Sequence, residues 1–127
     1  MVVGIEHVAI VSTNPEELAQ WYVDTLGFEI NYHSPSSRTH FVKASDGTMI
    51  EIILAKSSER GPNELRTPGI RHLALTVVGF AAACERLTSL GIEFLSPPET
   101  SKGNSVVFFK DPEGNILHLI EREKPLP

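Results

Sequence analysis

The chain has 127 residues, an ordinary apolar fraction of 41% and a formal net charge of −5. A chain of this length suits one compact domain, or two small modules that share a core. The acidic balance argues against nucleic acid as a partner, because phosphate binding needs a basic face, and no apolar run is long enough to cross a membrane.

The first half predicts a strand, a helix and three more strands. Residues 4–11 read Gly-Ile-Glu-His-Val-Ala-Ile-Val, which predicts a strand. Asn14-Pro15 followed by Glu17 is a helix-start signal, and Gly27 is expected to end the helix. Strands are then expected at 29–32 and 39–43, and at 48–53 after an Asp-Gly turn.

The second half repeats this order after a linker at 56–68 that holds Gly, Pro, Asn and several charges. Residues 69–77 read Gly-Ile-Arg-His-Leu-Ala-Leu-Thr-Val and repeat the first strand. A helix with apolar residues at 80, 83, 84, 87 and 90 is expected before Gly91, and strands at 93–95, 105–110 and 115–120. The landmarks recur at nearly constant separation, which predicts a duplication: module 1–55 and module 69–123 within a single domain, 1–127.

Four polar side chains recur on these strands. Because side chains alternate along a strand, the apolar residues of each strand can meet the helix of their module while the polar ones share the opposite face. Three imidazoles and one carboxylate suit a divalent transition metal such as Zn, Ni, Fe, Co or Mn, whereas calcium or magnesium would need more oxygens. The sequence therefore predicts four metal ligands: His7, Glu51, His72 and His118. The apolar set is Val8, Ile10, Ile50, Ile52, Leu73, Leu75, Leu117 and Leu119.

The paired modules, the two Gly-Ile-x-His-x-Ala strand starts, the Leu-Gly-Phe after the first helix and the Asp-Pro-Glu-Gly-Asn turn at 111–115 resemble the vicinal oxygen chelate superfamily. That group includes glyoxalase I, methylmalonyl-CoA epimerase, extradiol dioxygenases and bleomycin-binding proteins. The resemblance covers nearly the whole chain. It implies an α+β, glyoxalase-like fold in which two tandem βαβββ modules form an open, U-shaped barrel around one metal, with the ligand positions on the four residues above. In glyoxalase I and the epimerase the last position is usually Glu, whereas here it is His118.

The favoured function is a glyoxalase I-like lyase, isomerase or epimerase. The metal would bind two adjacent substrate oxygens and stabilise an enediolate, and Glu51 would act as the catalytic base. Two alternatives stay open: a non-haem Fe(II) ring-cleaving dioxygenase, and a binding protein that sequesters a drug without chemistry. Arg38 and His40, on the expected strand at 39–43 or beside it, are candidate contacts for a polar substrate.

The sequence also carries expectations about cellular location and assembly. The single Cys84 allows no internal disulfide, and the start of the chain carries no signal peptide, which together fit the cytoplasm. Two small modules leave apolar surface uncovered, so we expect a homodimer. The other expected partner is a small-molecule substrate with adjacent oxygens, and we expect binding to neither nucleic acid nor membrane.

Overall fold

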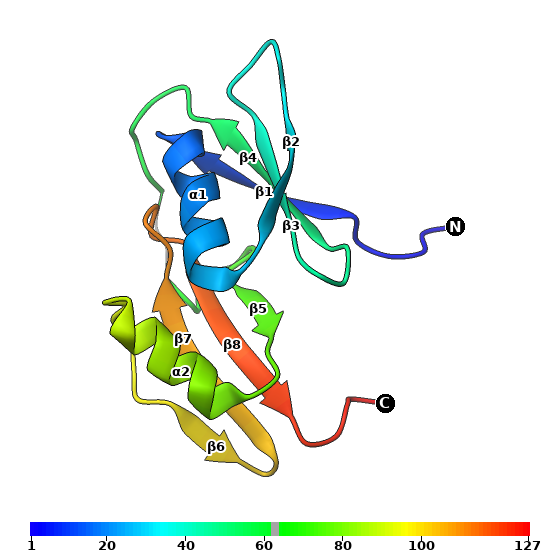
Figure 1. The fold of residues 1–127 in the computed structure, drawn as a ribbon, viewed down its shortest axis with the longest axis vertical. Coiled ribbons are helices and arrows are strands. Elements are labelled where there is room, and N and C mark those ends of the chain that lie inside the picture. The colour runs from blue at the N-terminus through cyan, green and yellow to red at the C-terminus, as the bar shows by residue number, and fades with distance from the viewer. Residues whose placement is uncertain (62–63) are drawn as a thin grey trace. The chain divides into compact units, whose positions relative to one another are not determined.

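The computed structural model describes residues 1–61 and 64–127, which divide into two compact units, Met1–Arg60 and Gly61–Pro127. The division falls inside the predicted linker. Within the described residues each unit holds one helix and one four-stranded sheet (Figure 1). None of the helices in this part of the chain has the length and apolar character that crossing a membrane requires.

The first unit has the element order that the sequence predicts. Its elements are β1 (His7–Ser12), α1 (Pro15–Leu26), β2 (Glu29–His33), β3 (His40–Lys43) and β4 (Met49–Leu54). The strands lie in the order β1-β4-β3-β2, with β1 parallel to β4 and the other pairs antiparallel. Because β1 and β4 are neighbours, the predicted ligands His7 and Glu51 lie on adjacent strands.

The ends of α1 follow local signals in the sequence. The Asn14 side chain accepts a hydrogen bond from the backbone N–H of Glu17 at 3.3 Å, and Pro15 occupies the first turn. At the other end Gly27 has a φ of 76°, a left-handed conformation that glycine adopts without the strain a side chain would add. The predicted helix is therefore confirmed at both ends.

The second unit has the same order of elements. It contains β5 (Leu73–Thr76), α2 (Phe80–Ser89), β6 (Glu99–Ser101), β7 (Asn104–Lys110) and β8 (Ile116–Arg122). The strand order β5-β8-β7-β6 repeats that of the first sheet, again with a parallel pair, β5 and β8, and antiparallel pairs elsewhere. The α+β class and the tandem βαβββ modules are confirmed. The U-shaped barrel depends on how the units pair and stays a prediction.

The helix α2 is capped differently from α1. Its N-cap is Gly79, which offers no side chain, and the Glu121 carboxylate of β8 accepts hydrogen bonds from the backbone N–H groups of Gly79 at 2.7 Å and Phe80 at 3.2 Å. A carboxylate at this position also complements the positive end of the helix dipole. Glu121 therefore ties the last strand to α2.

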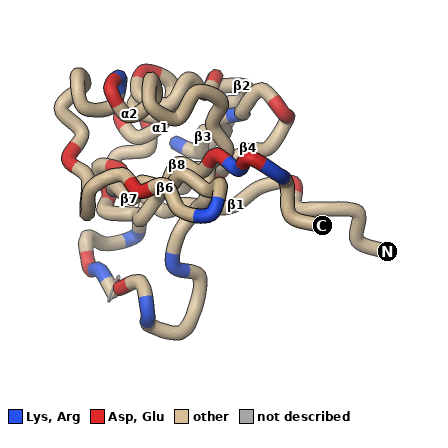
Figure 2. Tube along the Cα trace, turned by 90° about the horizontal axis from the view of Figure 1, so that it is seen from below, with Lys and Arg blue, Asp and Glu red and all other residues tan. Residues whose placement is uncertain are grey.

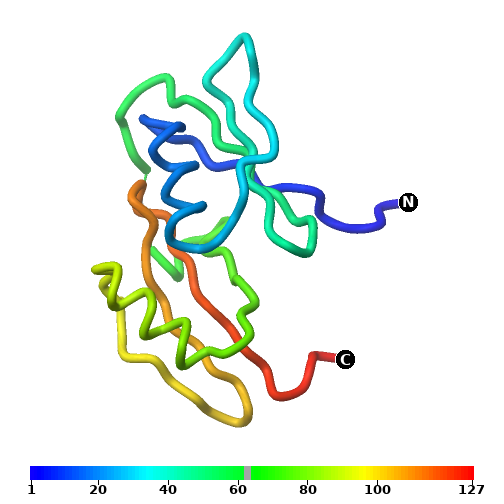
Figure 3. Tube along the Cα trace, viewed as in Figure 1, coloured from blue at the N-terminus to red at the C-terminus, as the bar shows by residue number. Residues whose placement is uncertain are grey.

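One expected strand is wrong. Residues 93–95 contribute only an isolated bridge between Phe94 and Phe109, and the edge strand is β6, a few residues later. β6 and β7 form a tight hairpin whose turn, Lys102-Gly103, has positive φ at both residues (yellow to orange in Figure 3). Pairing with β7 through this turn fixes the position of the edge strand more firmly than local apolar pattern does.

The predicted alternation holds in the central strands of both sheets. The apolar residues expected to meet the helix are mostly buried: Ile10, Ile50, Ile52, Leu117 and Leu119 are 0–7% exposed, whereas Val8, Leu73 and Leu75 are half-buried. In the first unit α1 contacts β1, β3 and β4, and in the second α2 contacts β8. The core of each unit thus lies between its helix and one face of its sheet, and the other face carries the predicted ligands.

Candidate metal centre

In the first unit β1 and β4 bring His7 and Glu51 together. Glu51 pairs with Ala9 in the parallel register, two residues along from His7. The His7 Nε2 and Glu51 Oε1 atoms are 3.7 Å apart, too far for a direct hydrogen bond, and the two side chains are 38% and 25% exposed. Both donor atoms are therefore open to a small ligand or an ion.

A third residue, Glu6, orients the His7 ring. Its Oε1 lies 2.8 Å from His7 Nδ1, so Nδ1–H donates to the carboxylate and Nε2 keeps the lone pair that a metal would need. A carboxylate behind the distal nitrogen is a common way to fix the tautomer of a ligating histidine. This role of Glu6 is not among the sequence-based predictions, although a charged residue precedes each strand-start histidine in the sequence.

In the second unit His72 and His118 lie together. His72 immediately precedes β5, and His118 pairs with Ala74, two residues further along, in the β5–β8 register. The centroids of the two imidazole rings are 4.8 Å apart, at an angle of 73°. Each unit therefore pairs its two predicted ligands in the same way, one at the start of its first strand and one on its last strand.

His118 lies in a less polar setting than His7. Its side chain is only 7% exposed, and its Nδ1 is buried without a hydrogen-bond partner. Burial lowers the pKa of His118 below its ordinary value, and the nearby His72 lowers it further. The ring is therefore neutral at pH 7, and it stacks on Phe108 with a centroid distance of 4.6 Å.

The four predicted ligands form two pairs, one within each unit. In the part of the chain that the structure describes, no group of three or more His, Cys, Asp or Glu side chains is close enough to hold a metal ion. A single centre with all four ligands stays a prediction.

The family of the chain follows from its sequence as well as its fold. A family model described as the Glyoxalase/Bleomycin resistance protein/Dioxygenase superfamily matches residues 4–119. The chain belongs to this superfamily. The matched range includes both units and all four predicted ligands, so the resemblance seen in the motifs is confirmed.

Two similar proteins match nearly the whole chain, and a third matches less than half of it. The protein YwkD of Bacillus subtilis is 30% identical over 125 residues, 94% of this chain and 97% of its own. A crystal structure of a glyoxalase family protein from Enterococcus faecalis is 30% identical, covers 94% of this chain and 98% of its own, and superposes with a TM-score of 0.76. The lactoylglutathione lyase of Pseudomonas aeruginosa is 34% identical over 53 residues, 42% of this chain and 30% of its own.

The donor atoms present fit the divalent metal that this superfamily suggests. The neutral His118 ring has a buried nitrogen without a partner, which is costly unless an ion or ligand approaches the imidazole. His7 offers a free Nε2, and Glu51 supplies a carboxylate 3.7 Å from it. Imidazoles with one carboxylate are a donor set that transition metals favour.

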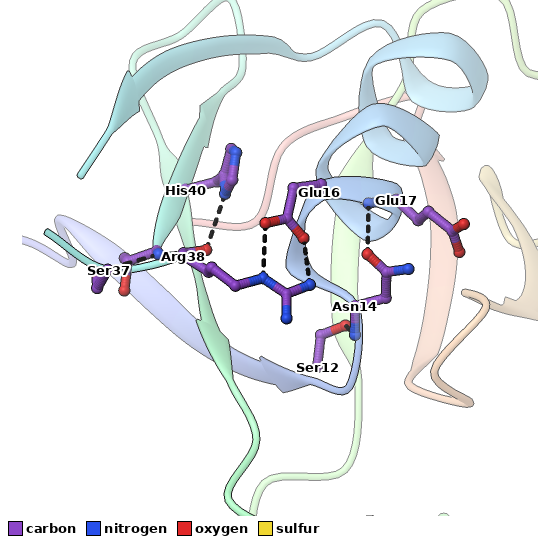
Figure 4. Close-up of polar contacts among 8 residues, drawn as sticks. Ser12, Asn14, Glu16, Glu17, Ser37, Arg38 and His40 are labelled. Atoms are coloured by element: carbon purple, nitrogen blue, oxygen red, sulfur yellow. Dashed lines mark hydrogen bonds and ion pairs between the residues drawn. The ribbon is translucent and has the colours of Figure 1, made fainter. Parts of the chain in front are cut away.

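The structure gives Arg38 and His40 partners away from these donors. The Arg38 guanidinium makes two hydrogen bonds, of 2.7 and 2.6 Å, to the Glu16 carboxylate at the start of α1 (Figure 4). His40 is 7% exposed, and its Nδ1 lies 2.9 Å from the Arg38 carbonyl oxygen. In the β3–β4 register His40 lies opposite Ile52, a core residue, whereas its neighbour Phe41 lies opposite Glu51. Phe41, and not His40, therefore shares the face of His7 and Glu51, the predicted ligands of the first unit.

Proposed function

We propose that this chain is a divalent-metal-dependent enzyme of the glyoxalase I-like type: a lyase, isomerase or epimerase that acts on a small molecule with two adjacent oxygens. The observation that supports it best is the repeated pairing of the predicted ligands, His7 with Glu51 and His72 with His118. In each unit the strand-start histidine thus lies beside a second side chain whose chemistry suits a transition metal, Glu51 or His118, as shared ligands would. The short match to a lactoylglutathione lyase points in the same direction.

The four side chains divide the work of the reaction. His7, His72 and His118 would hold the ion through imidazole nitrogens, and Glu51 would add the negative charge. The bound ion would act as a Lewis acid that polarises the two substrate oxygens. Glu51 Oε would take the proton from the carbon next to the substrate carbonyl and return it to the carbonyl carbon, while the proton of the neighbouring hydroxyl passes to the former carbonyl oxygen, which gives isomerisation. Epimerisation would instead need the proton to return to the opposite face of the first carbon.

Glu51 has this role because the donor set contains no second carboxylate. His118 takes the position where glyoxalase I and the epimerase usually have Glu, and Glu121 is engaged in capping α2. Among the four, Glu51 is thus the residue able to accept a proton from carbon as a carboxylate, and its 25% exposure leaves room for a small substrate.

Metal content is the first test. The protein should be purified without chelators or an affinity tag that binds metals, and its ions measured by inductively coupled plasma mass spectrometry. We expect about one divalent transition ion per chain, and its loss in a His7→Ala, His72→Ala double variant. Protein that is free of metal and takes up none on dialysis against Zn, Ni, Co, Fe or Mn would overturn the proposal and favour the drug-sequestering alternative.

Oxygen uptake separates the enzyme classes. We expect none when the Fe(II)-loaded protein is mixed with a catechol, because a third histidine occupies a position that ring-cleaving dioxygenases usually leave open. Consumption of oxygen with ring cleavage would favour the dioxygenase alternative.

The remaining proposals concern substrate contacts, assembly and location. Contact of Arg38 or His40 with substrate stays a prediction, and in the structure both have other partners. We propose a homodimer, because small modules leave apolar side chains uncovered: Val11, Ile70, Val78 and Leu90 are 47–93% exposed. We also propose a cytoplasmic location, which fits the single Cys84. Sedimentation equilibrium of the full chain would test the dimer. Lys and Arg are interspersed with Asp and Glu along the trace (Figure 2), which offers no support for a nucleic-acid partner.

A further inference from the structure

Phe41 and Phe108 occupy equivalent positions beside the two ligand pairs. Phe41 lies directly opposite Glu51 on the neighbouring strand, and Phe108 lies directly opposite His118. Each ring also meets the strand-start histidine of its unit edge to face, Phe41 with His7 at 5.6 Å and Phe108 with His72 at 5.7 Å between centroids. The duplication therefore extends beyond the ligands to an aromatic ring on the same face.

The two rings differ in what covers them. The Phe108 face is stacked on His118, at 4.6 Å and 23° between the rings. Among the aromatic pairs of the described residues, Phe41 meets His7 at 74° and Tyr32 at 68°, and no ring is stacked on it. The second unit thus uses the equivalent ring to support a histidine by stacking, whereas the first unit does not.

An irregularity in β2 brings Tyr32 to the same face as Phe41. Ile30 lies opposite Val42, a fully buried core residue, and strict alternation would place Tyr32 on that core side as well. The register shifts between Ile30 and Tyr32, so that Tyr32 lies opposite Phe41. β-Bulges often re-aim a side chain next to a functional site, and this one moves a large ring from the core side to the ligand side.

The result is a row of three rings: Tyr32, Phe41 and His7. The centroids of Tyr32 and Phe41 are 6.0 Å apart at 68°, and Phe41 follows with His7 at 5.6 Å. Tyr32 is 52% exposed and Phe41 is half-buried. Aromatic side chains contribute most to the energy of a core or an interface when they are buried, so these two rings have surface left for a ligand to cover. A flat apolar group bound along this row would cover Tyr32 and Phe41, and its end would lie next to His7 and Glu51.

We propose that Tyr32 and Phe41 form a subsite for a planar aryl group of the substrate. The two metal-binding oxygens of that substrate would lie at the His7 end of the row. The proposal rests on the proposed function, because it takes the oxygens to be held beside His7 and Glu51. It narrows the substrate class to aryl compounds that carry adjacent oxygens next to the ring.

The test uses three hydroxamates, which share one pair of adjacent oxygens and differ only in the attached group. Benzohydroxamate, cyclohexanecarbohydroxamate and acetohydroxamate are titrated by calorimetry into the full chain loaded with zinc. We expect the phenyl compound to bind about three- to tenfold more tightly than the cyclohexyl compound, since an aromatic pair adds to simple burial of apolar area. In Tyr32→Leu and in Phe41→Leu that ratio should fall toward one.

Phe28→Leu is the matched control. The Phe28 ring contacts Tyr22 of α1 and not the row, so the same chemical change there should leave the ratio unaltered. Equal binding of the phenyl and cyclohexyl compounds to the wild type, or a ratio unchanged in both row variants, overturns the aryl subsite alone. Failure of all three hydroxamates to bind the zinc-treated protein overturns the proposed function, and the subsite with it.

Discussion

The two ligand pairs have the same backbone positions but opposite surroundings. His7 and Glu51 are partly exposed, and the His7 ring is held by a hydrogen bond to Glu6. His118 is buried, its Nδ1 has no hydrogen-bond partner, and its ring is held by stacking on Phe108. The first pair contains a carboxylate with access to solvent, and the second contains two imidazoles, of which His118 is buried and His72 is exposed.

The difference suggests a division of tasks between the duplicated units. A group that exchanges protons with a substrate must be reachable, and Glu51 is. A group that only holds an ion gains from a dry setting, because burial keeps imidazole neutral and preserves its lone pair. Duplication would then have supplied two equivalent frames that both contribute ligands, of which only the first also carries the carboxylate for proton transfer.

The largest effect is expected from Glu51→Gln. Glutamine has the same shape and can still approach an ion, but it cannot accept the proton, so we expect turnover to fall by about 10²- to 10⁴-fold while most of the metal is retained. Deuterium exchange from heavy water into the α-carbon of an α-hydroxyketone, followed by NMR, measures the proton transfer directly. Full exchange activity in this variant would remove Glu51 from the role of base.

The buried histidine of the second pair is tested by His118→Leu. Leucine removes both nitrogens, so metal affinity should fall more than 100-fold, since loss of a mere orienting partner already costs 10- to 100-fold. The metal-free protein should be as stable as the wild type, or about 1 kcal/mol more stable, because a buried unsatisfied nitrogen is removed. Competition with a chelator and urea unfolding measure the two quantities.

His40→Leu is the matched control for that experiment. His40 is equally buried, but its Nδ1 is hydrogen-bonded to the Arg38 carbonyl oxygen. Its replacement should cost about 1 kcal/mol of stability and leave metal affinity unchanged. If His118→Leu destabilises the metal-free protein as His40→Leu does, the nitrogens of His118 have a structural task and the contrast between the two histidines is wrong.

Features set by local sequence could be predicted, and this includes the repeat itself. Asn14 and Gly27 determine the ends of α1 through hydrogen bonds and φ values that belong to adjacent residues. The two-residue period of a strand was enough to separate the core face from the ligand face. For this reason the common face of the four predicted ligands could be inferred from the sequence, whereas their arrangement as two pairs on neighbouring strands became visible only in the strand registers.

Features that depend on pairing between distant strands could not be predicted. The shift between Ile30 and Tyr32 exists only in the β2–β3 register, and the capping of α2 by Glu121 joins residues about forty positions apart. The ion pair of Arg38, a candidate substrate contact, could not be foreseen because its partner Glu16 lies 22 positions earlier, on a different element. Side-chain contacts of this kind decide which polar residues remain available to a substrate.

A smaller effect is expected from Glu6→Gln. The amide can still accept a weaker hydrogen bond from His7 Nδ1, and Glu6 is 72% exposed, so we expect metal affinity to fall by about tenfold or less. Glu29→Gln, a similarly exposed carboxylate in the same unit, is the control and should have no effect on affinity. A loss as large as that of His118→Leu would mean that Glu6 binds the ion itself, and the first pair would then be a group of three.

The smallest effect is expected from Glu16→Gln, which tests what Arg38 does. The hydrogen bonds from Arg38 hold the pKa of Glu16 at about 2, below its ordinary value of 4.5. A folded-state pKa below the unfolded value means that the ionised carboxylate stabilises the fold above pH 4.5 and that this contribution is lost as the pH falls toward 2. Urea unfolding should therefore show Glu16→Gln slightly less stable than the wild type at pH 7, with the difference narrowing below pH 4.5. Both residues are well exposed, so the effect is small.

Substrate affinity at pH 7 discriminates the two roles of Arg38: it should stay unchanged if Arg38 only anchors α1, and rise for an anionic substrate if the freed guanidinium contacts it.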